Sequence, residues 1–339
     1  MKNPCLSFSA KLRRAATTAV AVSATMLLAA ASAAAGDLSA TVKKASAPTI
    51  GQSDNVGYWL VAEDGKPVLQ YNYATVTLPE GFFKTLKKGD RRYAFPRSNY
   101  IHPLYGLDGA EITADWNRDH PHHRGIYWAW PEVAYKGKLH DLHAGQNVFA
   151  HPTGKIETTR NADGSLTLVA ENLWFWENKE AIATEQTKIT VFPRTANERK
   201  INLEFHFTAL KDGVTIARRQ TKHYGGLNVR MAKLPGWKEF SFRDKKSPAQ
   251  NPAWTGATWK NATGGHSELL AFEKRDNPCY PGEFITYPNL NWFQPTFPTG
   301  GTRFPLKTTE PLVLRFQLLI HETALADADR AGAWKAFQN

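Results

Sequence analysis

Short stretches in which apolar and polar residues alternate follow one another along most of the chain and predict β-strands. Val56–Glu63 and Pro67–Ala74 flank Asp64-Gly65-Lys66. Lys155–Arg160 and Ser165–Leu173 flank a second turn of the same kind. Glycine tolerates the positive φ that tight hairpin turns require, so each pair of strands is predicted to form an antiparallel hairpin.

Three later segments extend the pattern toward the C-terminus. Ala181–Phe192 and Lys200–Leu210 follow at close spacing, and the second alternates strictly between apolar and polar residues. Pro311–Ile320 is almost entirely apolar, which predicts a central strand with both faces buried. Thr323–Phe337 is rich in Ala, Asp and Arg and is the one helix predicted, with Thr323 as its N-cap.

Many strands without intervening helices predict an all-β fold in which antiparallel sheets pack face to face. No internal repeat, linker or low-complexity tract follows residue 53, so a single domain is expected over residues 54–339. Such a domain is much longer than an immunoglobulin-type sandwich of about 100 residues. The expected architecture is therefore a large antiparallel double-sheet sandwich with one C-terminal helix.

The first 35 residues have the three-part layout of a secretory signal peptide. Lys2, Lys11 and Arg13-Arg14 precede an apolar run, and Ala33-Ala34-Ala35 fits an A-x-A cleavage site. We expect an exported protein, periplasmic or secreted, that begins with a flexible leader over residues 36–53. Arg13-Arg14 leaves twin-arginine export open beside the general route. No later apolar stretch reaches the about 20 residues that a membrane helix needs, so no membrane partner is expected after cleavage.

The distribution of charge bears on the class of ligand. The formal net charge is +11, and the loss of four cations with the signal peptide lowers it to +7. The lysines and arginines are scattered, whereas a concentrated basic stripe is typical of proteins that bind nucleic acids. We therefore expect no nucleic-acid partner. A moderate positive charge favours a carbohydrate or another small polar ligand that is anionic, acidic polysaccharides among them.

The densest chemical signal is Asp119-His120-Pro121-His122-His123-Arg124-Gly125. In an extended segment His120 and His122 lie on one face and His123 on the other. Imidazole titrates near neutral pH and serves as general acid, general base or metal ligand, and guanidinium stabilises an oxyanion. We predict His122, His123 and Arg124 as catalytic residues and His120 as a binding residue. A hydrogen-bonded structural turn is the alternative interpretation.

Aromatic residues directly after this segment favour sugar binding. Ile126, Trp128 and Trp130 share one face of the predicted strand, and Tyr127 lies on the other. Aromatic faces beside polar groups suit sugar rings, although aromatic residues also dominate core burial. The residues predicted to bind substrate through aromatic surface are Tyr127, Trp128, Trp130, Tyr287 and Trp292.

Weaker candidates are spread over the rest of the chain. Lys222 and His223 precede Gly225-Gly226, where the missing side chains permit a close backbone approach to a ligand. Both are predicted to take part in catalysis. His102 precedes a proline in a predicted turn, and His321 ends the strand Pro311–Ile320; both are predicted to bind substrate.

Metal binding is left open by the sequence. His140 and His143 flank Asp141 and are candidate ligands, but a surface loop is equally compatible with this segment. The sequence contains no H-E-x-x-H metalloprotease motif, no G-x-S-x-G elbow and no glycine-rich phosphate loop. No residue is therefore assigned to a metal, and the cofactor is unknown.

Several of these segments together resemble an exported bacterial family labelled "methane oxygenase PmoA-like". The resemblance runs from about Val56 to Ile320. It is carried by the central histidine motif, Pro103-Leu104-Tyr105-Gly106, Gly225-Gly226-Leu227, Asn277-Pro278 and the strand that ends at His321. Members of the family accompany sugar-processing genes, and their sequences are similar to galactose mutarotase-like sandwiches, in which histidines and a carboxylate line a concave sheet. The resemblance implies such a supersandwich and a sugar substrate.

Two features limit what the resemblance implies. The label suggests a metal-dependent oxidoreductase, but particulate methane oxygenase subunits are bundles of membrane helices, and no membrane helix is predicted after the signal peptide. The resemblance also departs at His223, because members often carry a glutamate at this position, directly after the lysine that matches Lys222. A lysine–glutamate acid–base pair is therefore not carried over.

The residues and the resemblance together predict an exported carbohydrate-active enzyme with a histidine- and arginine-rich site. Acid–base chemistry on a sugar could be elimination, epimerisation or hydrolysis, and proton abstraction beside a carbonyl suits histidine best. One alternative is a non-catalytic carbohydrate-binding protein. Another is a metal-dependent oxidoreductase with His120, His122 and either His140 or His143 as ligands.

Overall fold

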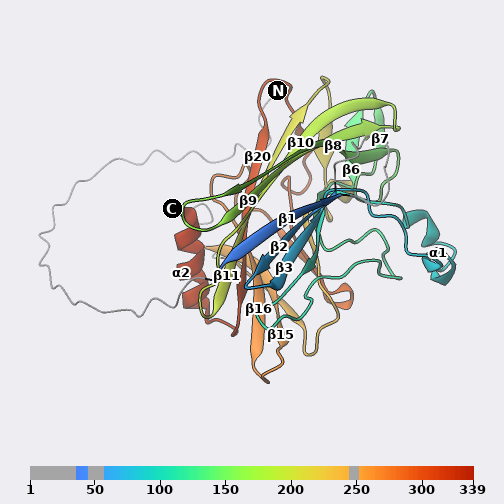
Figure 1. Ribbon diagram of the computed structural model, residues 1–339. Coiled ribbons are helices and arrows are strands. Elements are labelled where there is room, and N and C mark those ends of the chain that lie inside the picture. Colours follow the sequence, from blue (N-terminus) through green and yellow to red (C-terminus); the bar gives the residue numbers. More distant parts are fainter. Residues whose placement is uncertain (1–35, 45–56, 244–251) are drawn as a thin grey trace, which may run out of the picture.

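The computed structural model of the protein describes residues 36–44, 57–243 and 252–339. Strands account for 51% of the structure and helices for 9%, and the strands form three antiparallel sheets. This confirms the predicted all-β sandwich (Figure 1). The predicted signal peptide and residues 45–53 of the predicted leader lie outside the described residues. Within those residues, no helix is both long enough and apolar enough to cross a membrane.

Sheet 1 carries the strands on which the candidate site is built. Its eight strands are, in spatial order, β1 (Leu38–Lys44), β2 (Gly57–Glu63), β3 (Lys66–Asn72), β4 (Tyr100–Leu104), β5 (Ile126–Ala129), β13 (Gly226–Arg230), β18 (Trp292–Pro295) and β17 (Phe284–Tyr287). The hairpin of β2 and β3 turns at Asp64 and Gly65, which both have positive φ, as predicted.

Sheet 2 packs against one face of sheet 1. Its eight strands are, in spatial order, β14 (Lys238–Arg243), β15 (Ala253–Lys260), β16 (His266–Glu273), β20 (Leu312–His321), β11 (Glu198–Ala209), β10 (Glu180–Val191), β9 (Leu166–Trp176) and β8 (Val148–Arg160). The predicted strand Pro311–Ile320 corresponds to β20, which lies between β16 and β11 in the sheet and is therefore central, as expected.

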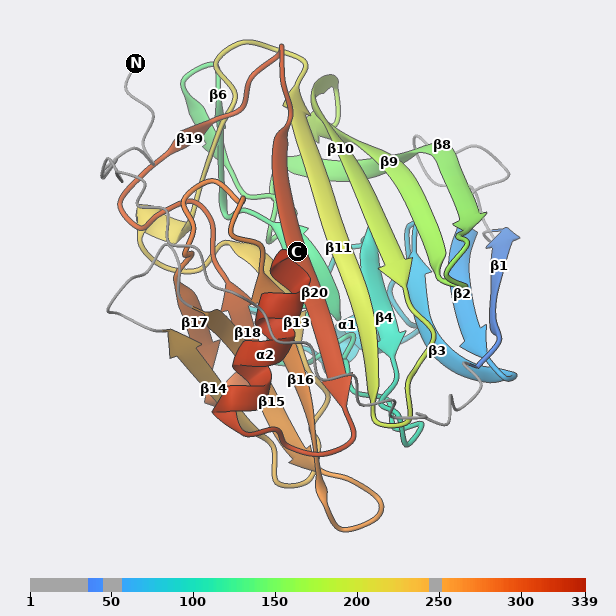
Figure 2. The ribbon, with the colours of Figure 1, turned by 90° about the vertical axis from the view of Figure 1, so that its left-hand side faces the viewer.

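A small third sheet and a few helices complete the fold. The third sheet has the order β19 (Phe304–Pro305), β12 (Thr215–Ala217), β6 (Glu132–Tyr135) and β7 (Lys138–His140). The helices are α1 (Phe82–Thr85), α2 (Asp327–Gln338) and the 3-10 turns η1 (Arg91–Tyr93), η2 (Arg219–Thr221) and η3 (Pro288–Leu290). Figures 1 and 2 show α2 against the outer face of sheet 2 and α1 standing away from the sandwich on the opposite side.

Two element boundaries differ from the sequence-based expectation. The segment predicted as a flexible leader contains β1, which pairs with β2 over its whole length and buries Leu38 completely. The predicted helix begins at Asp327 rather than directly after Thr323, and its N-cap is Ala326. The Thr323 hydroxyl instead lies 3.2 Å from Nδ1 of His321, so this side chain is used by the strand end that precedes the helix.

The core between the two large sheets is unusually rich in aromatic rings. Trp128 on β5 lies 5.3 Å from Phe205 and 5.7 Å from Phe316 between ring centroids, and Trp130 lies 5.7 Å from Trp174. Both tryptophans are at most 2% exposed. Because successive residues of a strand point to opposite faces, burial of Trp128 directs Tyr127 to the outer face of sheet 1.

Gly125 connects the histidine loop to β5 at a point where no side chain fits. Its φ is 58°, and a Cβ built there would lie 2.1 Å from the carbonyl oxygen of Ile101 on β4. The amide of Gly125 donates to the carbonyl of Ala114, and its carbonyl accepts from the amide of Arg230 on β13. The loop between Ala114 and Gly125 is therefore closed at its base by backbone hydrogen bonds.

We expect Gly125→Ala to lower the free energy of unfolding by at least about 3 kcal/mol, since left-handed strain is added to a backbone clash. Gly137→Ala is the matched control, because Gly137 has a φ of 74° and nothing within 4 Å of a built Cβ. That variant should lose about 1–2 kcal/mol, from backbone strain alone. Urea unfolding measures both. Equal losses would show that the Ile101 carbonyl does not constrain the loop.

Candidate functional site

A cavity of about 190 Å³ lies beside the hairpin of β17 and β18, and three histidines of the loop before β5 line it. We call it the histidine pocket. His120, His122 and His123 line it together with Tyr287 and Trp292. No aspartate or glutamate is among the described residues that line it. Its chemistry therefore depends on ring nitrogens, phenol groups and a guanidinium group rather than on carboxylates.

A larger hollow of about 480 Å³ lies at another place, between the turn joining β2 to β3 and the turn joining β10 to β11. Two buried charges in its wall, Glu63 and Arg199, are ion-paired with each other. Because those charges satisfy each other, we place the candidate site in the smaller histidine pocket.

His143, from the loop after β7, completes a cluster with His122 and His123. The ring centroids lie 4.5 Å apart for His122 and His123, 5.0 Å for His122 and His143, and 5.2 Å for His123 and His143. The ring planes meet at 78°, 74° and 85°, so the rings contact edge to face. One nitrogen from each ring lies within 4.8 Å of the other two.

Four nitrogens of this cluster are buried without hydrogen-bond partners among the described residues. His122, His123 and His143 are 7%, 2% and 1% exposed. Nδ1 of His122, Nδ1 of His123 and both nitrogens of His143 have no partner among the described residues. Burial, together with the charges of neighbouring groups, holds the pKa of all three imidazoles well below the usual range. All three rings are therefore neutral and carry a free lone pair at neutral pH.

An ion pair anchors the loop that carries these histidines. Nη2 of Arg230 donates to Oδ1 and Oδ2 of Asp119 at 3.1 and 3.0 Å, and Nδ1 of His120 lies 3.3 Å from Oδ2. Burial raises the pKa of Asp119, but the bonds from His120 and Arg230 outweigh it and hold that pKa well below its usual range. Asp119 therefore carries a full charge and fixes the loop to β13.

The His143 loop is a tight turn held by the backbone. Asp141 and Gln146 exchange two backbone hydrogen bonds of 3.1 and 2.7 Å, and Oδ1 of Asp141 accepts from the amide of Ala144 at 2.8 Å. The amide of His143 donates to the carbonyl of Trp130 at 3.2 Å. The same aromatic segment that fills the core thus places His143 beside the histidines from the other loop.

Aromatic rings form another part of the pocket wall. Trp292 stacks on Tyr287 with 4.8 Å between centroids, and its centroid lies 4.4 Å from that of His123. Trp292 is only 2% exposed, so neighbouring protein rings occupy its surface. Tyr93, Tyr224 and Tyr287 are partly exposed and also line the pocket. A ligand would therefore meet tyrosine rings, with Trp292 as the support behind them.

Arg219 supplies the positive charge of the pocket wall. Its Nη2 pairs with Oδ2 of Asp141, and its Nε donates to the hydroxyl of Tyr224 at 3.2 Å. The Arg219 side chain is 37% exposed, whereas that of Asp141 is 7% exposed. The guanidinium group is therefore held from behind by a buried carboxylate and remains accessible to a ligand.

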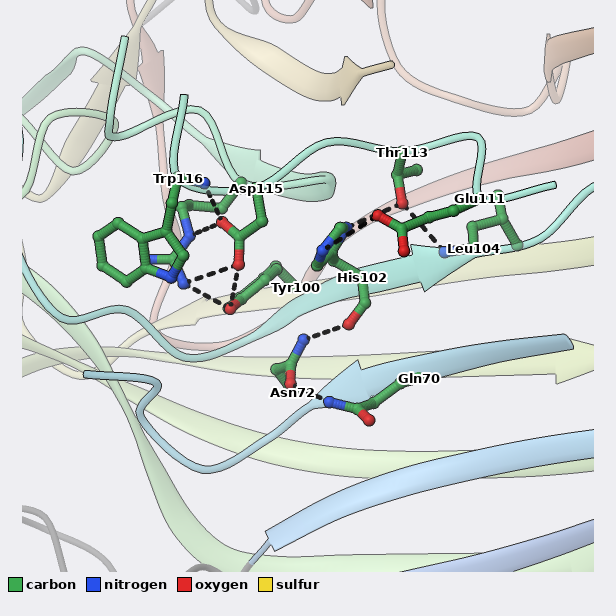
Figure 3. A network of polar contacts seen from close by, with 10 residues as sticks. Gln70, Asn72, Tyr100, His102, Leu104, Glu111, Thr113, Asp115 and Trp116 are labelled. Carbon is green, nitrogen blue, oxygen red and sulfur yellow. Dashed lines mark hydrogen bonds and ion pairs between the residues drawn. The ribbon is translucent and has the colours of Figure 1, made fainter. Parts of the chain in front are cut away.

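Two predicted site residues lie in a neighbouring polar network. Arg124 is fully buried, pairs with Asp115 and donates to the hydroxyl of Tyr100 at 2.5 Å. His102 lies 3.1 Å from the hydroxyl of Thr113, a contact visible in Figure 3. Neither residue lines the histidine pocket. Their bonds lie within the protein, where they join β4 to the segments before and within the histidine loop.

Other predicted site residues do not line the pocket. Trp128 and Trp130 fill the core between the sheets, so they form no binding wall. Lys222 and His223 are exposed, and their carbonyls accept hydrogen bonds from Arg218. The predicted close approach at Gly225-Gly226 is to protein, since a Cβ on Gly226 would lie 2.5 Å from the carbonyl oxygen of Pro295.

Two further predicted residues differ in their distance from the site. His321 ends β20 on sheet 2 and bonds to the carbonyl of Thr323, so it has no part in the pocket. Tyr127 lies on the outer face of sheet 1, buried beneath the cluster, with its ring centroid 5.7 Å from that of His143. The guanidinium carbon of Arg97 lies 4.1 Å from the centre of the Tyr127 ring.

Several residues at the pocket were not assigned a role from the sequence. His143 was considered only as a possible metal ligand, and Arg219, Tyr224 and Tyr93 were not considered. The segment around His143 did carry a signal, because aspartate favours turns in which its side chain bonds to a nearby backbone group, as Asp141 does with the amide of Ala144. Tyr93 and Arg219 lie in short 3-10 turns without periodicity, and only the fold brings them to the histidines.

Fold and site together define an all-β sandwich with a histidine-lined pocket on the outer side of one sheet. Residues 58–335 match the model of a family of unknown function, DUF6807, and the chain belongs to this family. A comparison with curated proteins found no match, and neither did a comparison with solved structures. The family description names no reaction, so the function has to be inferred from the pocket.

We expect Asp119→Asn to lower the free energy of unfolding by about 1–2 kcal/mol, because a charge-assisted bond to the buried Arg230 is weakened and Asp119 is partly exposed. Asp108→Asn is the control, since Asp108 bonds only to the amide of Ala110 among the described residues. Urea unfolding and proteolysis within residues 115–124 measure the effect. A variant as stable and as protease-resistant as the wild type would show that this ion pair does not hold the loop.

Proposed function

We propose that this protein is an exported carbohydrate-active enzyme whose reaction takes place in the histidine pocket. The observation that carries the proposal is the convergence of three neutral, unpartnered imidazoles on a cavity walled by partly exposed tyrosines. Buried polar groups are normally satisfied within the protein, and a cluster of groups that are not, beside a cavity, is explained by a role in catalysis or in binding. Tyrosine rings beside polar groups offer both stacking and hydrogen bonds to a sugar.

The size of the pocket favours a small substrate. Its volume of about 190 Å³ is below the about 300–1,000 Å³ of cavities that hold drug-sized ligands. A single sugar ring, free or at the end of a chain, suits this space. We propose that the remainder of a longer saccharide would lie outside the pocket.

The reaction class follows from the groups that line the pocket. Hydrolysis by a pair of carboxylates requires two acidic side chains beside the bond that is broken. The described lining contains none. Proton abstraction beside a carbonyl, as in elimination or epimerisation, needs an acceptor and a group that stabilises the resulting oxyanion. The histidine cluster and Arg219 provide these two functions, so we propose this class rather than hydrolysis.

Charge around the pocket supports an anionic substrate. Arg219 faces the cavity, and the projecting segment of residues 80–92 carries five cations and two acids. All five of these cations are exposed: Lys84, Lys87, Lys88, Arg91 and Arg92. The segment ends beside Tyr93, which lines the pocket. A positive approach to a cavity raises the local concentration of anions, which favours uronic acids or other acidic sugars.

The finer family assignment and the location of the protein belong to this proposal. The resemblance to the "methane oxygenase PmoA-like" family adds a sugar context through its members' gene neighbours. Its likeness to galactose mutarotase-like sandwiches adds a concave, histidine-lined sheet. The signal-peptide pattern of residues 1–35 supports export, so an extracellular or periplasmic saccharide is the substrate that we propose.

Purified protein is expected to convert acidic or oxidised saccharides, and the His122→Ala, His123→Ala double variant should lose at least about 100-fold in kcat/KM, since it removes the groups assigned to the reaction. Product analysis by mass spectrometry and NMR follows the reaction on a panel of oxidised and unoxidised oligosaccharides. His266→Ala, an exposed histidine on β16, is the control. Full activity of the double variant would remove the assigned role. Glycan-dependent thermal stabilisation without turnover would indicate a non-catalytic binding protein.

Arg219→Gln is expected to lower the preference for an acidic sugar over its neutral analogue by about 10-fold or more, because a charge-assisted bond to the substrate is lost. Arg219→Lys keeps the charge and should retain part of the preference. The ratio of kcat/KM values for the two sugars measures the effect, which separates it from a general loss of stability. An unchanged ratio in Arg219→Gln would show that Arg219 does not recognise the charged group of the substrate.

A further inference from the structure

We infer that His122, His123 and His143 bind one divalent transition-metal ion at the inner end of the histidine pocket. Among the described residues these three form the one group of histidine, cysteine or carboxylate side chains found with a suitable arrangement for a metal. The inference concerns the site of the proposed function, but binding of the ion can be measured without a substrate and does not require turnover.

The geometry of the cluster brings three nitrogens close to one point. One ring nitrogen of each histidine lies within 4.8 Å of the other two, and the rings meet nearly at right angles. Two nitrogens that bind one tetrahedral ion at about 2.0–2.1 Å lie about 3.4 Å apart. Modest rotations of the rings would therefore bring the three nitrogens to ligand distances without movement of either loop.

The burial of the cluster supplies a second, independent observation. His123 and His143 are almost completely buried, and His122 is 7% exposed, yet Nδ1 of each ring and Nε2 of His143 have no partner among the described residues. A buried polar atom without a partner destabilises the folded protein. A metal ion satisfies such lone pairs, whereas an apolar ligand would not.

The ligand set restricts the kind of ion. Three imidazoles without thiolate or carboxylate suit zinc, copper, iron or nickel. Magnesium and calcium prefer oxygen ligands, which the described cluster lacks. Three protein ligands leave a position open for water or substrate, as in catalytic zinc sites. That position would face the pocket, because His122 and His123 line it.

The surrounding charges determine what else the ion would bind. Arg97, Arg219 and Arg230 all act on the cluster electrostatically and oppose a dication. Arg219 is paired with Asp141 and Arg230 with Asp119, while Arg97 packs over Tyr127 and donates to the carbonyl of His143. The excess positive charge favours an ion that also holds an anion, such as hydroxide or an acidic oxygen of a substrate.

His120 has a different role from the other three histidines. Its side chain is 38% exposed and lies beside Asp119, and its ring centroid is 4.8 Å from that of His123. It is therefore placed at the mouth of the pocket, outside the group of three ligands. With the ion held by His122, His123 and His143, its bound hydroxide would supply the base for proton abstraction, and His120 would be the side chain positioned to exchange protons with solvent.

The test uses the untagged mature protein, purified and dialysed against metal-free buffer after a chelator. We expect close to one equivalent of zinc to bind in calorimetry, and cobalt(II) to give the intense visible absorption of a four-coordinate site. His143→Ala and His122→Ala should each weaken zinc binding by about 100-fold or more. His266→Ala should bind as the wild type does, and His120→Ala should change the affinity by less than about 10-fold. Circular dichroism checks that each variant is folded.

The cobalt spectrum of the wild type requires no variant, so the inference remains testable if a histidine variant does not fold. Absence of stoichiometric zinc and cobalt binding would overturn it, as would unchanged affinity in folded His143→Ala. Thermal stabilisation by sulfate or phosphate without metal binding would also overturn it and would indicate an anion site. Metal binding without saccharide turnover would refute the proposed function alone, and saccharide turnover by a protein that binds neither zinc nor cobalt would refute the metal site alone.

Discussion

The packing of Trp128 and Trp130 between the two large sheets is the interaction on which the site depends. These rings contact Phe205, Phe316 and Trp174 of sheet 2, which fixes the face that β5 presents to the core. The alternation of side chains then requires Tyr127 to lie on the outer face. The carbonyl of Trp130 also accepts a hydrogen bond from the amide of His143. The core and the histidine cluster are therefore set by the same short segment.

The sandwich also explains how the protein can hold so many unsatisfied polar groups. Two eight-stranded sheets bury a large apolar core, whereas the histidine cluster lies outside that core, between loops anchored to Arg230 on β13 and to the backbone of Trp130. Lone imidazole nitrogens and the unpartnered Nε and Nη1 of Arg230 each lower stability. A large core tolerates such losses, and the groups remain available to a ligand. Stability and chemistry are thus assigned to opposite faces of sheet 1.

Much of the fold was predictable because it depends on local patterns. The hairpin at Asp64-Gly65 and the strict alternation in β11 are both encoded within a few residues. Leu38–Lys44 was missed as a strand because small and polar residues dominate it. The segment is extended because it pairs with β2. Thr323 was an acceptable N-cap by residue type, but its hydroxyl contacts Nδ1 of His321 instead of the helix.

The candidate site was only partly predictable, for a related reason. His122 and His123 were identified because they lie in one dense motif, whereas His143 joins them only through the fold. The direction of Trp128 was the main ambiguity, since alternation places Trp128 and Tyr127 on opposite faces but does not say which face is inside. The sequence likewise did not show whether Arg124 faces a ligand or the protein interior. Its burial against Asp115 shows that a charged residue within a reactive motif can have a structural role.

The contrast between Arg124 and Arg219 shows what separates a structural cation from a functional one. Both pair with an aspartate, but Arg124 is fully buried and also bonds to Tyr100, whereas the Arg219 side chain is 37% exposed at the pocket. A fully buried guanidinium cannot be reached by a ligand, while a partly exposed one can donate to it. Accessibility beside unpartnered imidazoles, rather than membership of the motif, therefore identifies the groups that can act on a substrate.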